Sequence, residues 1–126
     1  MYDILLKNAR VVDPSQDIDG ILDVAVKDGV IACLQAGIPP EQARVTYPLD
    51  GKIVVPGLID AHCHPALDFA GHAVHPDDAG VNAGVLLAGD AGSAGAANFH
   101  TLRAMYFGRV RPDLVSLLNA ASSTQI

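Results

Sequence analysis

The first 55 residues alternate between apolar and polar positions in short runs, and turn residues separate these runs. The run "ILDVAVK" at residues 21–27 alternates with a period of two, which indicates a half-buried strand. Asp28-Gly29 joins it to "VIACL", and this pair is typical of a two-residue hairpin in which both positions have a positive φ. We also expect short strands on either side of Asn8-Ala9, and a second tight turn at Asp50-Gly51. Residues 1–55 are therefore predicted to form a small all-β unit.

The pattern changes after Val55. The run "PGLIDAH" is apolar until its polar end, which is typical of a strand buried on both faces in a parallel sheet, and "VLLAGD" is a second strand of this kind. A third strand is predicted at "DLVSLLNA". A short helix is predicted from Pro76 to Gly84, and a longer one after Asn98, where apolar residues recur at helical spacing. The order strand, helix, strand, helix, strand predicts a parallel α/β fold for residues 56–126.

Charge and composition exclude several classes of partner. The net charge is −6, and both parts are acidic: five Lys and Arg against eight Asp and Glu in residues 1–55, then three against six. We therefore expect no binding to nucleic acid or to a membrane surface. Asp3, Lys7 and Arg10 interrupt the apolar N-terminal stretch, so we expect no secretory signal and a cytoplasmic location. The two cysteines are too few for a disulfide framework.

The end of the predicted strand at residues 56–62 carries the strongest chemical pattern, the sequence His62-Cys63-His64. Residues i and i+2 of a strand lie on the same face, roughly 6.6 Å apart, so both imidazoles are expected to project together while Cys63 faces away. Two imidazoles so placed can hold one metal ion, and the carboxyl ends of parallel strands are where α/β barrels gather catalytic groups. A pair of purely structural histidines is the alternative. The pattern favours metal ligands.

Three further residues are candidates for supporting the pair or for contacting substrate. Asp60 is expected to share the face of the histidines, where it can orient an imidazole or bind backbone at the strand end. His72 lies in the following loop, where it can contact substrate or simply be solvated. Asp90 ends the second strand beside a glycine-rich segment whose spacing is not that of a phosphate-binding loop. Asn119 is a weaker candidate for support of the same site.

Three segments together resemble the start of the amidohydrolase superfamily, in its dihydroorotase, hydantoinase and deacetylase branch. They are "DILLKNARVVDP", "DVAVKDGVIACL" and "LDGKIVVPGLIDAHCHP", and the last contains the motif Pro-Gly-hydrophobic-hydrophobic-Asp-x-His-x-His. The segment "GVLLAGDAGSAGAANF" is similar to the second barrel strand and glycine-rich loop of deacetylase-like members. The resemblance implies a small β-sandwich, begun by residues 1–55, before a metal-dependent (β/α)8 barrel of TIM type. Residues 56–126 would be its first three strands and two helices, an incomplete barrel.

The resemblance also implies an activity. One or two divalent ions, with zinc expected, would activate water for attack on an amide, cyclic amide or N-acyl bond of a small molecule, and His62 and His64 would hold the more buried ion. Family members take further ligands from later strands, including a carboxylated lysine or an acid, whereas this chain has no lysine after Lys52. We therefore expect an N-terminal fragment that contains no catalytic residue, is inactive alone and belongs to a homo-oligomer at full length. A non-catalytic, dihydroorotase-like interaction or assembly module is the alternative.

Overall fold

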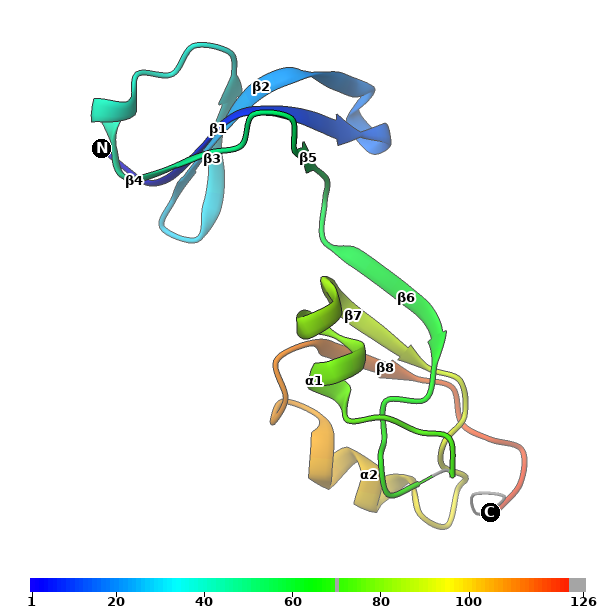
Figure 1. Ribbon diagram of the computed structural model, residues 1–126. Coiled ribbons are helices and arrows are strands. Elements are labelled where there is room, and N and C mark those ends of the chain that lie inside the picture. The colour runs from blue at the N-terminus through cyan, green and yellow to red at the C-terminus, as the bar shows by residue number, and fades with distance from the viewer. Residues whose placement is uncertain (70, 123–126) are drawn as a thin grey trace. The chain divides into compact units, whose positions relative to one another are not determined.

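The computed structural model describes residues 1–69 and 71–122, and contacts divide the chain into two compact units, Met1–Pro56 and Gly57–Ile126. Figure 1 shows the first unit in blue to green and the second in green to red. This division lies within one residue of the change in sequence pattern after Val55.

The first unit is a five-stranded sheet, as its alternating pattern predicts. Its strands are β1 (Tyr2–Asp13), β2 (Ile18–Lys27), β3 (Val30–Gln35), β4 (Ala43–Pro48) and β5 (Ile53–Val54), with short 3-10 helices at Pro14–Gln16 and Pro40–Gln42. The order is β3-β2-β1-β4, and β5 also pairs with β1. The pairs β1–β2 and β2–β3 are antiparallel, whereas β4 and β5 both run parallel to β1.

The predicted hairpin is present, but the predicted break in the first strand is wrong. Asp28 and Gly29 have φ angles of 52° and 77°, which fits the tight connection between β2 and β3. At Asn8 the chain does not turn. Asn8 has a φ of 61° inside β1, and the register with β2 shifts between Leu6 and Ala9. This bulge exists because the Asn8 backbone N–H turns toward the side chain of Asp23, to which it donates at 2.7 Å.

Asp23 is a buried carboxylate in this sheet and is 3% exposed. It accepts hydrogen bonds from the backbone N–H of Ile38 at 2.8 Å and from the Lys7 ammonium at 3.1 Å, in addition to that of Asn8. Burial alone raises the pKa of Asp23, but these backbone donors and the ammonium outweigh it, and the pKa lies below the ordinary value. Asp23 therefore ties three segments of the unit together as a charged group.

The second unit contains the predicted parallel α/β arrangement. Its elements are β6 (Leu58–Cys63), α1 (Pro76–Ala79), a 3-10 turn at Val81–Ala83, β7 (Val85–Asp90), α2 (Phe99–Tyr106) and β8 (Asp113–Ser116). The three strands are parallel in the order β6-β7-β8 (Figure 1). Strand β8 ends earlier than predicted, and α2 is only two turns long. Phe107 is extended and Gly108 has a φ of 69°, which ends α2, and Asn119 forms only an isolated bridge to Gly95 beyond β8.

Helix α2 covers one face of this small sheet. Leu102 and Tyr106 are buried with Ala66 and Ala94, and Leu114 of β8 packs against them. The prediction that the strands are buried on both faces is wrong here. Ile59 of β6 is 67% exposed and Leu86 of β7 is 54% exposed. Three strands form an open sheet, and no closed barrel exists among the described residues, so the barrel stays a prediction.

Candidate metal centre

His62 and His64 lie together at the carboxyl end of β6. Their ring centroids are 6.1 Å apart and their planes are almost perpendicular. Two imidazoles on one tetrahedral zinc ion have centroids roughly 5 Å apart, so a small side-chain rotation brings this pair to one ion. Cys63 lies apart from them, because its Sγ faces the carbonyl oxygen of Gly89 on β7 at 3.5 Å. The structure thus brings together the two residues that the sequence predicts as ligands.

The ring of His64 is held on one side by the loop after β7. Its Nδ1 lies 3.1 Å from the hydroxyl oxygen of Ser93 and 3.9 Å from Oδ1 of Asp90. The side chain of His64 is 25% exposed. Within the described part of the chain, Nε2 of His64 has no hydrogen-bond partner, so this nitrogen is free to bind a metal ion.

Asp90 is the most buried of the predicted site residues and is 3% exposed. Its carboxylate accepts from the backbone N–H of Ser93 at 3.0 and 3.2 Å and from the Ser116 hydroxyl at 2.6 Å. The glycine-rich loop after β7 therefore folds back on the strand end, and its N–H groups are used inside the protein.

Asp60 and His72 both reach the strand end, in different ways. Oδ1 of Asp60 accepts a hydrogen bond from the backbone N–H of His62 at 3.0 Å. Of the two predicted roles, orienting an imidazole or binding backbone at the strand end, this contact is the second. The ring of His72 stands edge-on to that of His64, with centroids 4.6 Å apart. The loop histidine is thus placed beside the pair.

Other candidate side chains have structural partners. His75 precedes α1, and its Nδ1 accepts from the backbone N–H of Asp77 at 3.2 Å. Burial raises the pKa of the Cys63 thiol, and the negative charges of Asp60 and Asp90 raise it further, so this thiol stays protonated near neutral pH. Asn119 donates to the carbonyl oxygen of Gly92 at 2.9 Å and so holds the glycine-rich loop.

Sequence reasoning missed Ser93 and Ser116. Ser93 stands three residues after Asp90, the distance at which a carboxylate often accepts from a backbone N–H of its own turn. Ser116 is the last residue of β8 and so lies at the same sheet edge as the end of β7. Both positions follow from the parallel topology, but serine is too common near turns for either to stand out in a single sequence.

The chemistry of this donor set fits a metal ion in part. Neutral imidazole is a good ligand for zinc, and a catalytic zinc ion takes three protein ligands and a water molecule. His62 and His64 supply two of the three. No group of three or more His, Cys, Asp or Glu side chains is arranged to hold a metal ion within residues 1–69 and 71–122. The two histidines alone are one protein ligand short of such a catalytic zinc site.

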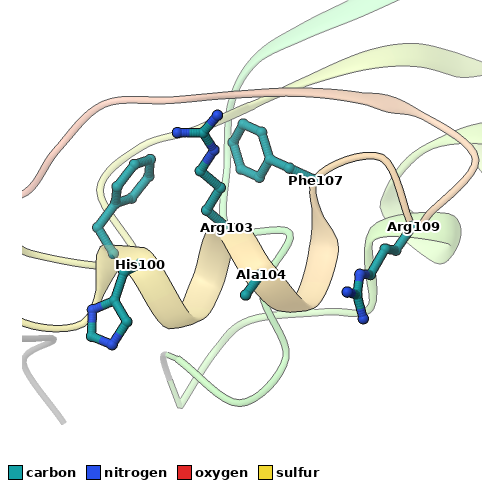
Figure 2. Close-up of a pocket in the computed structure, with 6 residues that line it drawn as sticks. His100, Arg103, Ala104, Phe107 and Arg109 are labelled. Carbon is teal, nitrogen blue, oxygen red and sulfur yellow. The ribbon is translucent and has the colours of Figure 1, made fainter.

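A hollow of about 580 Å³ lies over α2, and neither His62 nor His64 lines it. It is lined by Phe99, His100, Arg103, Ala104, Phe107 and Arg109. Figure 2 shows that these side chains come from the helix and the segment that follows it. None of the predicted site residues lines it, and His100 is exposed there, as its helical position predicts.

The chain is similar to dihydroorotases in sequence and structure, although no protein-family model matches it. A dihydroorotase of Trichlorobacter lovleyi is 44% identical over 69 residues, which are 52% of this chain and 16% of that protein. A solved dihydroorotase structure matches with a TM-score of 0.78 and 29% identity, and the match covers 98% of this chain and 33% of the dihydroorotase chain. A solved adenine deaminase has a TM-score of 0.74 and 28% identity, over 98% of this chain and 32% of its own.

A solved D-aminoacylase described as having a binuclear metal centre also resembles the chain. Its TM-score is 0.57 and its identity 26%, over 71% of this chain and 18% of its own. No helix in the described residues has the length and apolar character to cross a membrane. The chain thus spans a small part of the length of the relatives it matches. In its sequence, its parallel strands and its paired histidines, the chain is similar to the N-terminal part of members of the amidohydrolase superfamily.

Proposed function

We propose that the protein carrying this chain hydrolyses C–N bonds of small molecules, in an amide, cyclic amide or N-acyl group, with the help of a divalent metal ion held in part by His62 and His64. Zinc is the ion expected from the two imidazole donors. The observation that carries the proposal is the placement of both rings, 6.1 Å apart, at the carboxyl end of a parallel strand.

The remainder of the site supports the same function. A divalent ion held there would lower the pKa of a bound water molecule and polarise the carbonyl group that is to be cleaved. His62 and His64 would hold this ion, and the ring of His72 lies beside them, 4.6 Å from that of His64. The water oxygen forms a bond to the carbonyl carbon, the C–N bond breaks, and the nitrogen leaves with a proton.

Two features define what the chain contributes to this reaction. The backbone N–H of His62 donates to Asp60, and Nδ1 of His64 faces Ser93, so one member of the pair is held through its main chain and the other through its ring. The general base and the missing ligand are not among the described residues. We expect the rest of the barrel to supply both, and the full protein to be the active form.

The test is turnover by the zinc-loaded protein with a panel of cyclic amides, which includes dihydroorotate, and of N-acyl amino acids. We expect hydrolysis of one member of the panel, and at least a hundredfold loss of kcat/KM in His62→Ala and His64→Ala, because each removes a ligand. His100→Ala is the matched control, since His100 is an exposed helix residue, and it should keep full activity.

A lack of turnover across the panel by protein that still binds zinc through both histidines would contradict the hydrolase. It would support the non-catalytic interaction or assembly module instead. Equal activity in wild type and in the two histidine variants would refute the site while leaving the hydrolase standing.

A further inference from the structure

We propose that Asp90 and Ser93 are positioning residues that fix the ring of His64 so that its Nε2, and not its Nδ1, is the metal ligand. The inference rests on the proposed function, since it assumes that His64 binds a metal ion. It assigns the buried carboxylate at the end of β7 a role distinct from substrate binding and from direct metal ligation.

The carboxylate of Asp90 is already engaged by neighbouring groups of its own unit. Oδ1 accepts from the backbone N–H of Ser93 at 3.0 Å, and Oδ2 accepts from the same N–H at 3.2 Å and from the Ser116 hydroxyl at 2.6 Å. The residue is 3% exposed, so substrate cannot reach it without a change of structure. Asp90 therefore acts on its surroundings through Ser93.

Ser93 connects the carboxylate of Asp90 to the ring of His64. Ser93 is 1% exposed, and its hydroxyl oxygen lies 3.1 Å from Nδ1 of His64. A neutral imidazole that binds a metal ion through Nε2 carries its proton on Nδ1, and this N–H needs an acceptor. The Ser93 hydroxyl is that acceptor, and Asp90 holds the backbone of Ser93 in place. The pair thus selects the ring orientation that leaves Nε2 free.

A comparison of the two buried aspartates among the described residues supports a metal-linked role for Asp90. Asp23 and Asp90 are each 3% exposed. Asp23 is paired with the Lys7 ammonium at 3.1 Å, whereas no Lys or Arg in the described residues forms an ion pair with Asp90. The ring of His64 faces this carboxylate, with Nδ1 3.9 Å from Oδ1 of Asp90. Buried charges are normally paired, and a cation bound to the far nitrogen of this ring supplies the missing positive charge.

The experiment measures zinc affinity by competition with a chelator in the protein that carries this chain, with each variant folded as judged by circular dichroism. Ser93→Ala removes the acceptor for Nδ1–H, and Asp90→Asn removes the charge that anchors it. We expect each to weaken zinc binding about 10- to 100-fold, the usual effect of losing a partner that orients a ligand. Asp23→Asn is the matched control, an equally buried carboxylate in the other unit, and should leave the affinity within about twofold.

A second control and a spectroscopic measurement separate positioning from a general loss of stability. Ser116→Ala removes a hydrogen bond to Asp90 without touching His64, so its effect should be smaller than that of Ser93→Ala. Histidine-selective 15N NMR of the zinc-bound protein should show His64 ligated through Nε2 in wild type, and a mixture of ring states in Ser93→Ala.

The outcomes are distinguishable. Weakened zinc binding in Ser93→Ala and Asp90→Asn with normal binding in Asp23→Asn supports the inference. Wild-type affinity in Ser93→Ala, or equal losses in Asp90→Asn and Asp23→Asn, overturns it and leaves the proposed function intact. A wild-type protein that binds no zinc overturns the proposed function and this inference together.

Discussion

The buried carboxylate of Asp23 offers a quantitative test of how the first unit is held together. Its replacement by Ala leaves the backbone N–H groups of Asn8 and Ile38 without their acceptor and the Lys7 ammonium without its counter-charge. A buried donor left unpaired costs about 1–3 kcal/mol, and loss of one partner from a buried ion pair costs about 3–5 kcal/mol. Because Lys7 is partly exposed and Asn8 is exposed, we expect about 3 kcal/mol in total for Asp23→Ala.

Asp19 is the matched control on the same strand. It accepts both Arg10 hydrogen bonds at 2.7 Å, but the two side chains are 53% and 54% exposed. Exposed ion pairs contribute at most about 1 kcal/mol, so Asp19→Ala should cost much less than Asp23→Ala although it loses a bidentate contact.

Urea unfolding followed by circular dichroism measures both variants. With a denaturant slope of about 1–3 kcal/mol/M, the midpoint of Asp23→Ala should fall by roughly 1–3 M, and that of Asp19→Ala by less than about 1 M. Equal shifts for the two variants would refute the argument, because they would mean that burial and the backbone donors add nothing to the contribution of Asp23.

Three further predictions follow from the same structure. Folding lowers the pKa of Asp23, so the stability contributed by its charged form is fully present above the unfolded pKa of about 4 and is lost as pH falls through the lower folded pKa. The difference in unfolding free energy between wild type and Asp23→Asn should therefore shrink over that pH range, as measured by urea titrations at several pH values. Leu102→Ala should cost about 2–5 kcal/mol in thermal unfolding, because Leu102 is 1% exposed, whereas Leu118→Ala, at a site 57% exposed, should change stability by less than about 1 kcal/mol. Gly89→Ala should lower the melting temperature, because its Cβ would lie 2.9 Å from the backbone oxygen of Ala61; an unchanged melting temperature would show that the two strands can separate easily.

Local patterns predicted the elements of this fold well. The Asp28-Gly29 hairpin, the helix start at Pro76 and the three strands after Val55 depend on the chemistry of neighbouring residues, which one sequence contains. The bulge at Asn8 could not be predicted in the same way. It depends on Asp23, 15 residues further along, and on a hydrogen bond that forms only when β1 and β2 pair.

In the candidate site, too, the residues set by local periodicity could be predicted, and those set by tertiary contacts could not. His62 and His64 could be predicted because the period of a strand places positions i and i+2 together. The contact of His72 with His64, and the positions of Ser93 and Ser116 around Asp90, depend on how a loop and two more strand ends meet in space. Periodicity contains no information about such contacts. Parallel topology predicts the edge at which they gather and leaves the individual partners open.

Metal content tests the central claim most directly. The protein that carries this chain, purified without chelators, should contain at least one zinc ion per chain by inductively coupled plasma mass spectrometry. The double variant His62→Ala/His64→Ala should lose that zinc ion, because it removes two ligands at once, while His100→Ala should retain it. The same zinc content in the double variant as in wild type would contradict the assignment of the histidine pair as a metal site.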